Sequence, residues 1–216
     1  AQAVDVPIPL VNPGFDIDDA SGGDVFGATG WNTFGSGFTS SSLFDDCCRP
    51  LADSGDNVFK AFGGGGGATQ SFAASEGDVF NMSGLGQNFV GDALNNPGQL
   101  LLQIYFRDEN GAPAGTAAGG NAAEGFNFFN SNVVDWTNPT DNIWTELGVG
   151  TGAAPDNTAS VDFNVLVLAP AGGAGFFDSI EANQVVSAVP VPAAVWLFGS
   201  GLVGLVGVAR RRKAQA

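Results

Sequence analysis

The sequence predicts an all-β fold, an antiparallel β-sandwich of the jelly-roll type, followed by a single C-terminal transmembrane helix. Three observations support the sandwich. Short runs alternate between apolar and polar residues, turn-forming residues (Gly, Asn, Asp, Pro) separate these runs, and no window repeats apolar residues with the helical period. Eight or so strands without intervening helices are typical of two packed antiparallel sheets.

Two segments show the alternation most clearly, and each gives a strand with one continuous apolar face. The flanking Asn110-Gly111 and Ala171-Gly172-Gly173 have turn chemistry. The apolar positions Leu100, Leu102, Ile104 and Phe106 alternate with Leu101, Gln103, Tyr105 and Arg107, and Val161, Phe163, Val165 and Val167 alternate with Asp162, Asn164, Leu166 and Leu168. Further strand candidates are Val58–Phe62, Thr69–Ala74, Asp78–Ser83, Glu124–Asn130, Ile143–Val149 and Phe176–Ala182. We expect the glycine run Gly63–Gly67 and the stretch Gly111–Gly125 to be mobile loops.

Charge is distributed unevenly along the chain. Seven bases and 22 acids give a net charge of −15. Four of the seven bases lie at residues 210–213, which leaves three bases against 22 acids before residue 210, a net charge of −19. So acidic a surface repels phosphate backbones and excludes nucleic acid as a partner. The expected partners are cations, neutral glycans, basic surfaces, or copies of the chain bridged by a divalent ion.

The sequence also lacks the usual signatures of catalysis. Histidine is absent, which removes His-dependent triads and His-ligated zinc. There is no Gly-x-Ser-x-Gly elbow, Walker loop or dinucleotide fingerprint. We therefore predict no catalytic residue and no enzyme. A polysaccharide hydrolase with paired carboxylates is the alternative, although the sequence assigns no such pair to a cleft.

The only cysteines, Cys47 and Cys48, are adjacent, a spacing that suits neither zinc nor a Cys-x-x-Cys site. In an oxidising compartment they would form a vicinal disulfide or cross-link to another chain, and two reduced surface thiols are the alternative. The chain opens with Ala1-Gln2-Ala3, the small-x-small pattern that precedes a signal-peptidase cut. We therefore expect residues 1–9 to be the segment left after signal-peptide removal and residues 10–186 to be the sandwich domain.

The C-terminal end has a different character. Residues 193–209 are uncharged and just long enough to span a bilayer as a helix. The basic residues that follow would hold this end in the cytoplasm. Before the helix, Pro190 and Pro192 interrupt any helical continuation from the body. We predict a Pro-rich linker at 187–192, a transmembrane helix at 193–209 and a basic cytoplasmic tail at 210–216.

The order of Pro-x-Pro, short membrane helix and arginine cluster resembles the PEP-CTERM sorting signal of Gram-negative bacteria. Val191 stands where the name-giving motif has Glu. The resemblance implies that an exosortase in the inner membrane recognises the anchored tail, cleaves near the prolines, and delivers the body to the cell surface or extracellular matrix. The chain would then be a structural or adhesive protein associated with exopolysaccharide or biofilm. The residues that carry the resemblance are Pro190, Val191, Pro192, Arg210, Arg211 and Arg212.

The order of motifs in the body resembles galactose-binding-like jelly rolls, including carbohydrate-binding modules. The first-strand pattern Asn-x-x-Phe-Glu is followed at residues 12–16, with Asp16 in place of Glu. The last-strand pattern, aromatic-aromatic-Asp-Asp-Val, is followed at residues 176–180, with Ser179 in place of the second Asp. The resemblance implies that Asp16 and Asp178 ligate a structural Ca²⁺, with Asp53 and Asp56 as weaker candidates. Solvated turn carboxylates are the alternative interpretation.

A calcium-stabilised carbohydrate-binding module is therefore the alternative function. Sugar rings stack on exposed aromatic side chains, for which the candidates are Trp31, Trp136, Trp144 and Tyr105. Trp31 follows a glycine and begins a predicted strand, and Trp144 falls in an apolar run with Ile143 and Leu147, so both are expected in the core. Trp136, between Asp135 and Thr137-Asn138-Pro139, is the predicted ligand-binding aromatic.

Overall fold

The computed structural model describes residues 3–21, 23–41, 49–115, 127–169 and 171–187. The chain divides into a body, Asp5–Val186, and a second unit composed of Ala1–Val4 and Ser187–Ala216. The predicted membrane helix and basic tail, and both cysteines, lie outside the described residues, as does most of the predicted loop at 111–125. None of the helices in the described ranges has the length and hydropathy needed to cross a membrane.

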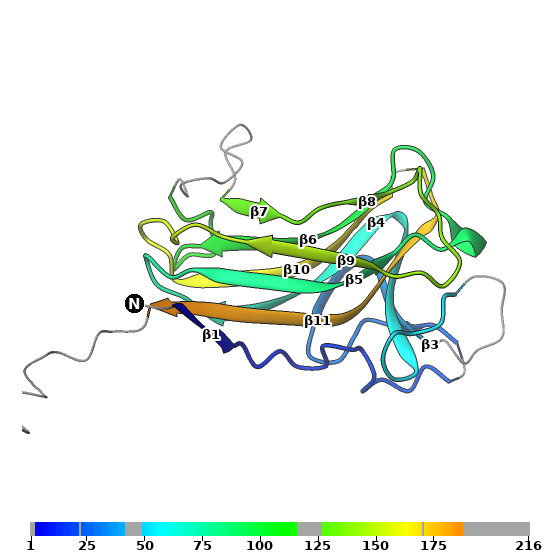
Figure 1. The fold of residues 1–216 in the computed structure, drawn as a ribbon, viewed down its shortest axis with the longest axis horizontal. Helices are drawn as coiled ribbons and strands as arrows, with labels where there is room; N and C mark the ends of the chain where they lie inside the picture. The colour runs from blue at the N-terminus through cyan, green and yellow to red at the C-terminus, as the bar shows by residue number, and fades with distance from the viewer. Residues whose placement is uncertain (1–2, 22, 42–48, 116–126, 170, 188–216) are drawn as a thin grey trace, which may run out of the picture. The chain divides into compact units, whose positions relative to one another are not determined.

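The body consists of antiparallel strands, which confirms the all-β prediction (Figure 1). Within the described residues one 3₁₀ turn, η1 (Val90–Asp92), interrupts them. The strands are β1 (Ala3–Pro7), β2 (Val25–Phe26), β3 (Asn32–Ser41), β4 (Asn57–Ala73), β5 (Phe80–Gln87), β6 (Gln99–Arg107), β7 (Phe128–Asn130), β8 (Val134–Asp135), β9 (Thr145–Gly150), β10 (Ser160–Leu168) and β11 (Ala174–Ser187).

The strands form two layers that share β3 and β4. The first part of β4, residues 59–62, pairs with β11, and the order continues through β5 to β9. The second part, residues 66–73, pairs with β10, and the order continues through β6 to β7. We call the layer that contains β11, β5 and β9 the first sheet and the layer that contains β10, β6 and β7 the second sheet.

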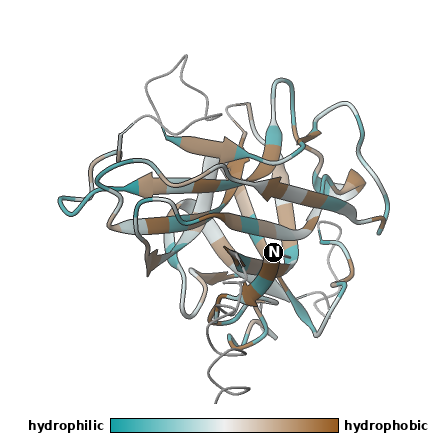
Figure 2. Ribbon diagram, turned by 60° about the vertical axis from the view of Figure 1, so that its left-hand side comes forward, coloured by the Kyte–Doolittle hydropathy of each residue, from teal (hydrophilic) through white to brown (hydrophobic). Residues whose placement is uncertain are grey.

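The core lies between the two sheets and is rich in phenylalanine. The inward positions of β6 and β10 are the apolar positions that the alternation predicted, and they are buried. The Phe80 ring of the first sheet meets Phe106 and Phe163 of the second, with ring centroids 6.0 and 5.9 Å apart. Figure 2 shows the same alternation as changing hydropathy colours along the strands. Burial of these large rings supplies the main favourable contribution to folding.

The five glycines lie inside β4, so the prediction of a loop at Gly63–Gly67 is wrong. Glycine is needed in this strand because the backbones of β3 and β4 approach each other closely. A Cβ atom on Gly66 would lie 2.7 Å from the amide N of Ser36 and 2.9 Å from the carbonyl O of Phe34, both in β3. Only glycine leaves room for β3 and β4 where they pass from one sheet to the other. The two predicted strands Val58–Phe62 and Thr69–Ala74 are thus one strand.

β9 lies at the edge of the first sheet, where unpaired backbone groups invite another strand. A side chain covers part of this edge. The Asn132 amide donates to the carbonyl O of Glu146 at 2.9 Å and accepts from the amide N of Gly148 at 3.0 Å. In a parallel sheet, one residue of an added strand would donate to the carbonyl O of Glu146 and accept from the N–H of Gly148 in the same way. Asn132 therefore occupies the place of an added strand.

Replacing Asn132 by alanine is expected to increase self-association, because it frees the outward carbonyl of Glu146 and the outward N–H of Gly148 at the edge of β9. Sedimentation velocity should show a larger share of dimers and higher oligomers than in the parent protein. Asn138→Ala is the matched control, because Asn138 is also an exposed loop residue and makes only a backbone hydrogen bond, to Asp135. Equal association of the two variants would contradict the role given to Asn132.

Candidate functional site

A row of polar side chains crosses the outer face of the second sheet. Cross-strand pairing places each member directly opposite the next, so that all five project from the same face. The row spans four inter-strand steps, about 19 Å at ~4.8 Å per step. We call it the amide row; in spatial order it consists of Asn130 (β7), Gln103 (β6), Asn164 (β10), Thr69 (β4) and Asn32 (β3).

The amide row has unused hydrogen-bonding capacity. Within the described residues its one side-chain hydrogen bond runs from Gln103 Nε2 to Asn130 Oδ1, at 3.0 Å. Asn164 is only 7 % exposed and has no hydrogen-bond partner within the described residues. The exposed part of its side chain is the amide, whose atoms are in contact with solvent. Next to it, Thr69 Oγ1 is buried without a partner. Polar groups left unpaired in a folded protein call for a ligand or water.

Asparagines elsewhere in the body have a different environment. The side chains of Asn12, Asn57 and Asn88 each bond to backbone groups and hold loops in place. Asn95 does the same at the carbonyl O of Ala171. No such bond fixes Asn32 or Asn164 within the described part of the chain. The amides of the row are therefore not explained by the needs of the fold.

Aromatic side chains flank the amide row on both sides. Half-buried Tyr105 lies two residues along β6 from Gln103, and Phe34, 44 % exposed, lies two residues along β3 from Asn32. The Arg107 guanidinium lies 4.6 Å from the centroid of the Tyr105 ring and is paired with the buried Asp162. Burial raises the pKa of the Tyr105 hydroxyl, with a smaller lowering by Arg107, so this group stays a neutral donor and acceptor at neutral pH.

This arrangement suits a polyhydroxylated ligand. Amides both donate and accept hydrogen bonds, as the hydroxyl groups of sugars do. The aromatic flanks offer apolar surface to the C–H faces of a sugar ring. The described side chains of the row and its flanks carry one base and one acid, joined to each other.

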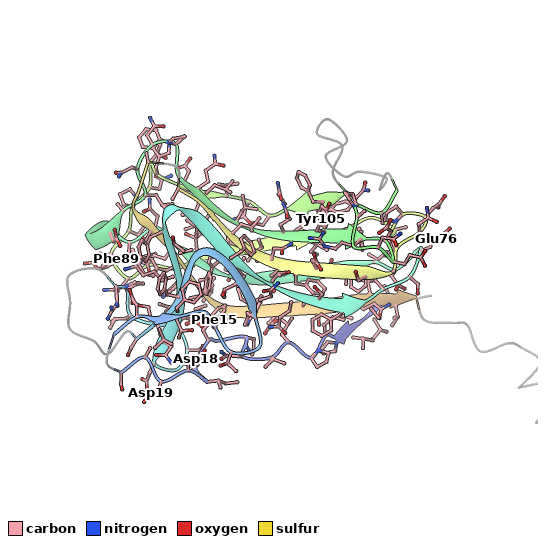
Figure 3. The ribbon with its side chains drawn as sticks, turned by 180° about the vertical axis from the view of Figure 1, so that it is seen from behind. Phe15, Asp18, Asp19, Glu76, Phe89 and Tyr105 are labelled. Carbon is pink, nitrogen blue, oxygen red and sulfur yellow. The ribbon has the colours of Figure 1, made fainter. Side chains whose placement is uncertain are left out.

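The carboxylates of Asp16 and Asp178 meet on another part of the body. Asp178 Oδ2 accepts from the amide N atoms of Asp53 and Ser54, at 2.8 and 2.9 Å. Asp16 Oδ1 accepts from the amide N atoms of Asp56 and Asn57, at 2.9 and 3.0 Å. The segment 53–57 thus connects the two acids. Figure 3 shows the neighbouring Asp18 and Asp19 on the side of the body opposite to Tyr105.

Burial raises the pKa of Asp178, whose side chain is fully buried, although hydrogen bonds from Ser54, Ser179 and Asp53 act in the opposite direction. Its Oδ1 accepts from the hydroxyl of Ser54 and the amide N of Ser179. Each oxygen of this carboxylate therefore has two donors. The Ser179 backbone, with a φ of 51°, turns at a β-bulge to make this possible.

The chemistry of these oxygens only partly fits the calcium ion that the sequence resemblance implies. Asp16 Oδ2 accepts no hydrogen bond within the described residues, whereas each oxygen of Asp178 already accepts two. A Cβ atom on Gly14 would lie 3.0 Å from Asp16 Oδ2, 3.1 Å from Ser54 Oγ and 3.6 Å from Asp178 Oδ1, so three hard oxygens lie close to this glycine. Asp53 and Asp56 contribute their backbone N–H groups to the two carboxylates. The described residues contain no group of three or more acidic, His or Cys side chains able to hold a metal.

The tryptophans are distributed as follows. Trp31 is buried and donates to the carbonyl O of Asn12, and Trp144 is half-buried and donates to that of Leu51. Trp136 is 39 % exposed and follows β8, beside the Gln99 end of β6. It therefore lies beyond the amide row along the strand direction, and its ligand-binding role stays a prediction.

Sequence reasoning did not predict the amide row as a site. Gln103 and Asn164 stand at alternating polar positions of the two clearest predicted strands. Their meeting depends on the register between β6 and β10, which joins residues 61 apart in the chain. Thr69 and Asn32 pair across β4 and β3, where the glycine run concealed the strand.

Comparison with solved structures shows the same fold in proteins of different functions. A cyclase from Fischerella sp. TAU has a TM-score of 0.58 at 12 % identity, covering 85 % of this chain and 100 % of its own. The Stig cyclase Fisc from the same organism has a TM-score of 0.57 at 13 % identity, covering 84 % of this chain and 98 % of its own. The CBM22-1 xylan-binding domain of Paenibacillus barcinonensis Xyn10C has a TM-score of 0.51 at 16 % identity, covering 87 % of this chain and 100 % of its own. At these identities the likeness establishes the fold alone.

Comparison with curated proteins finds no match. The model of the PEP-CTERM protein-sorting motif matches residues 188–213, which include both prolines of the predicted motif and its arginines. The match begins one residue after β11 ends. The chain is therefore an exported antiparallel β-protein that carries a PEP-CTERM protein-sorting motif directly after its last strand.

Proposed function

We propose that this protein is a surface or matrix component that binds extracellular polysaccharide through the amide row. The observation that carries the proposal is the partly unsatisfied row itself, above all Asn164, which is buried among strands yet has no hydrogen-bond partner in the described part of the chain. The sorting motif supports export through transient anchoring in the membrane. Exosortase is the proposed processing partner, and the exopolysaccharide of a bacterial biofilm is the proposed site of retention.

The proposed role is binding without catalysis. The amide row contains no carboxylate, and Asp162 beside it is engaged by Arg107 and by the Ser71 hydroxyl. Glycoside hydrolysis needs two carboxyl groups on either side of the scissile bond. Cyclase activity is a property of the Fischerella proteins named above.

Asn164→Ala is expected to weaken polysaccharide binding about 3- to 10-fold, the range for one or two lost neutral hydrogen bonds. The melting temperature should change little, because the side chain makes no hydrogen bond within the described body. Affinity gel electrophoresis with soluble xylan, galactan, mannan and mixed-linkage β-glucan measures the affinity for polysaccharide. Thermal denaturation measures the melting temperature.

Asn183→Ala on β11 is the matched control, since Asn183 is a half-buried strand asparagine of the first sheet. It should bind as the parent protein does. If Asn164→Ala retained full affinity for every glycan that the parent binds, the amide row would not be the binding site.

Calcium is proposed as a structural ion at the space above Gly14. When bound there, Ca²⁺ would offset the charge of Asp16 and Asp178 and tie the segment 53–57 to both carboxylates. We expect Ca²⁺ to raise the melting temperature of the parent protein and chelation to reverse the rise. Gly14→Ala should abolish this response, because its Cβ would fill the space between the three oxygens. An unchanged melting temperature of the parent on both treatments would contradict the calcium proposal.

A further inference from the structure

We infer that the ligand of the amide row is an uncharged glycan chain that crosses the strands of the second sheet and binds by an internal segment. This inference rests on the proposed function and specifies its ligand. Two independent features support it, namely the pairing of every basic residue of the body and the exposure of both ends of the row.

All three bases that precede the C-terminal cluster are used inside the body. Arg49 Nη2 lies 2.8 Å from Asp24 Oδ1, and Lys60 Nζ lies 3.3 Å from Asp92 Oδ2. The Lys60 side chain is 8 % exposed and lies over the rings of Phe62 and Phe176. Neither base lies on the second sheet, and neither has a charge available to a ligand there.

Arg107 is the only base on the second sheet, and three groups hold it. Its Nε donates to the Asp162 carboxylate, its Nη1 donates to the carbonyl O of Gly111 at 2.8 Å, and its guanidinium covers the Tyr105 ring. Asp162 is 3 % exposed and also accepts from the Ser71 hydroxyl at 2.6 Å. Withdrawing Arg107 to bind a uronate would leave Asp162 buried without its cation, which is costly.

The net charge of the body also favours an uncharged ligand. A net charge of −19 before residue 210 repels a polyanion at distances within the Debye length, about 8 Å at physiological salt. A polycation would be attracted to any acidic part of the surface, and this attraction would weaken with salt and would not depend on the amide row. Amide–hydroxyl bonds to a neutral chain depend on the row and are nearly insensitive to salt.

The direction of the chain follows from the arrangement of the amides. They lie on consecutive strands, so a ligand that meets all of them must run across the strands. Exposure is highest at the two ends, Asn130 and Asn32, and lowest at the middle, Asn164. A chain that contacts the centre can therefore continue past both ends. Recognition of an internal segment needs no contact with a chain terminus.

The test uses the full chain in affinity gel electrophoresis at low and high salt. The neutral probes are xylan, galactan, mannan and mixed-linkage β-glucan, the anionic probes are alginate and polygalacturonate, and the cationic probe is chitosan. We expect retardation by at least one neutral polymer that is unchanged by salt and reduced several-fold by Asn164→Ala. Retardation that depends on Asn164 and is confined to an anionic or cationic polymer would overturn the uncharged class and leave glycan binding intact. No retardation by any polymer would overturn the proposed function itself.

The internal segment is tested with oligosaccharides of increasing length from the retained polymer. Affinity measured by calorimetry should rise with length until the oligosaccharide spans about 19 Å, four inter-strand steps. Asn130→Ala and Asn32→Ala, at opposite ends of the row, should each weaken binding of the long oligosaccharides about 2- to 5-fold. An effect of only one of these variants, or full affinity for a disaccharide, would show that the ligand binds by one end and would overturn the internal segment.

Discussion

Gly66→Ala is expected to destabilise the protein by about 2–3 kcal/mol, because the new methyl group overpacks the place where β3 and β4 cross between the sheets. The atoms that it would meet first are backbone atoms of Ser36 and Phe34, which cannot rotate away as a side chain can. For a chain of this size the corresponding fall in melting temperature is about 4–12 °C. Thermal and urea denaturation measure it.

Gly148→Ala is the matched control, since Gly148 also lies in a strand, β9, and a Cβ atom there would meet no atom within 4 Å. It should melt close to the parent protein. Equal melting temperatures of parent and Gly66→Ala would mean that β3 yields at no cost and that the glycine run is not required by packing.

Asp178→Asn is expected to lower the free energy of unfolding by about 3–4 kcal/mol, although it changes only one oxygen atom to NH₂. Each oxygen of the carboxylate accepts from two donors, so either orientation of the amide places a donor against two others. The segment 53–57 would lose its attachment to β11. Glu76→Gln is the control, because Glu76 is exposed and lies at the end of the body away from Asp18 and Asp19 (Figure 3). Similar denaturation midpoints for the two variants would contradict the structural role of Asp178.

The sequence predicted the strands whose patterns are local. In β6 and β10 the apolar and polar positions alternate without interruption, and the structure confirms their inward faces. β3 lacks this pattern, because its first half alternates poorly and contains Gly35 and Gly37 where the sheets cross. The glycine run failed as evidence for a loop, because glycine permits both a free loop and a tightly packed strand.

The candidate site was predictable only in part, for a related reason. Gln103 and Asn164 occupy polar positions of strands that the sequence predicted, but no local pattern shows that they face each other. The juxtaposition of Asp16, Asp178 and the segment 53–57 entered only through resemblance, since its hydrogen bonds join residues up to 125 apart. The sorting motif, by contrast, is a continuous stretch of chain, and sequence alone was sufficient to locate it.

β11 is the last strand in the sequence but not the last in the sheet, since it inserts between β4 and β5. The hydrogen-bonded path from β4 to β5 is therefore complete only when residues 174–187 are in place. The sorting motif starts at residue 188. The strand that joins the two halves of the first sheet and the segment that carries the sorting motif are thus adjacent in the chain.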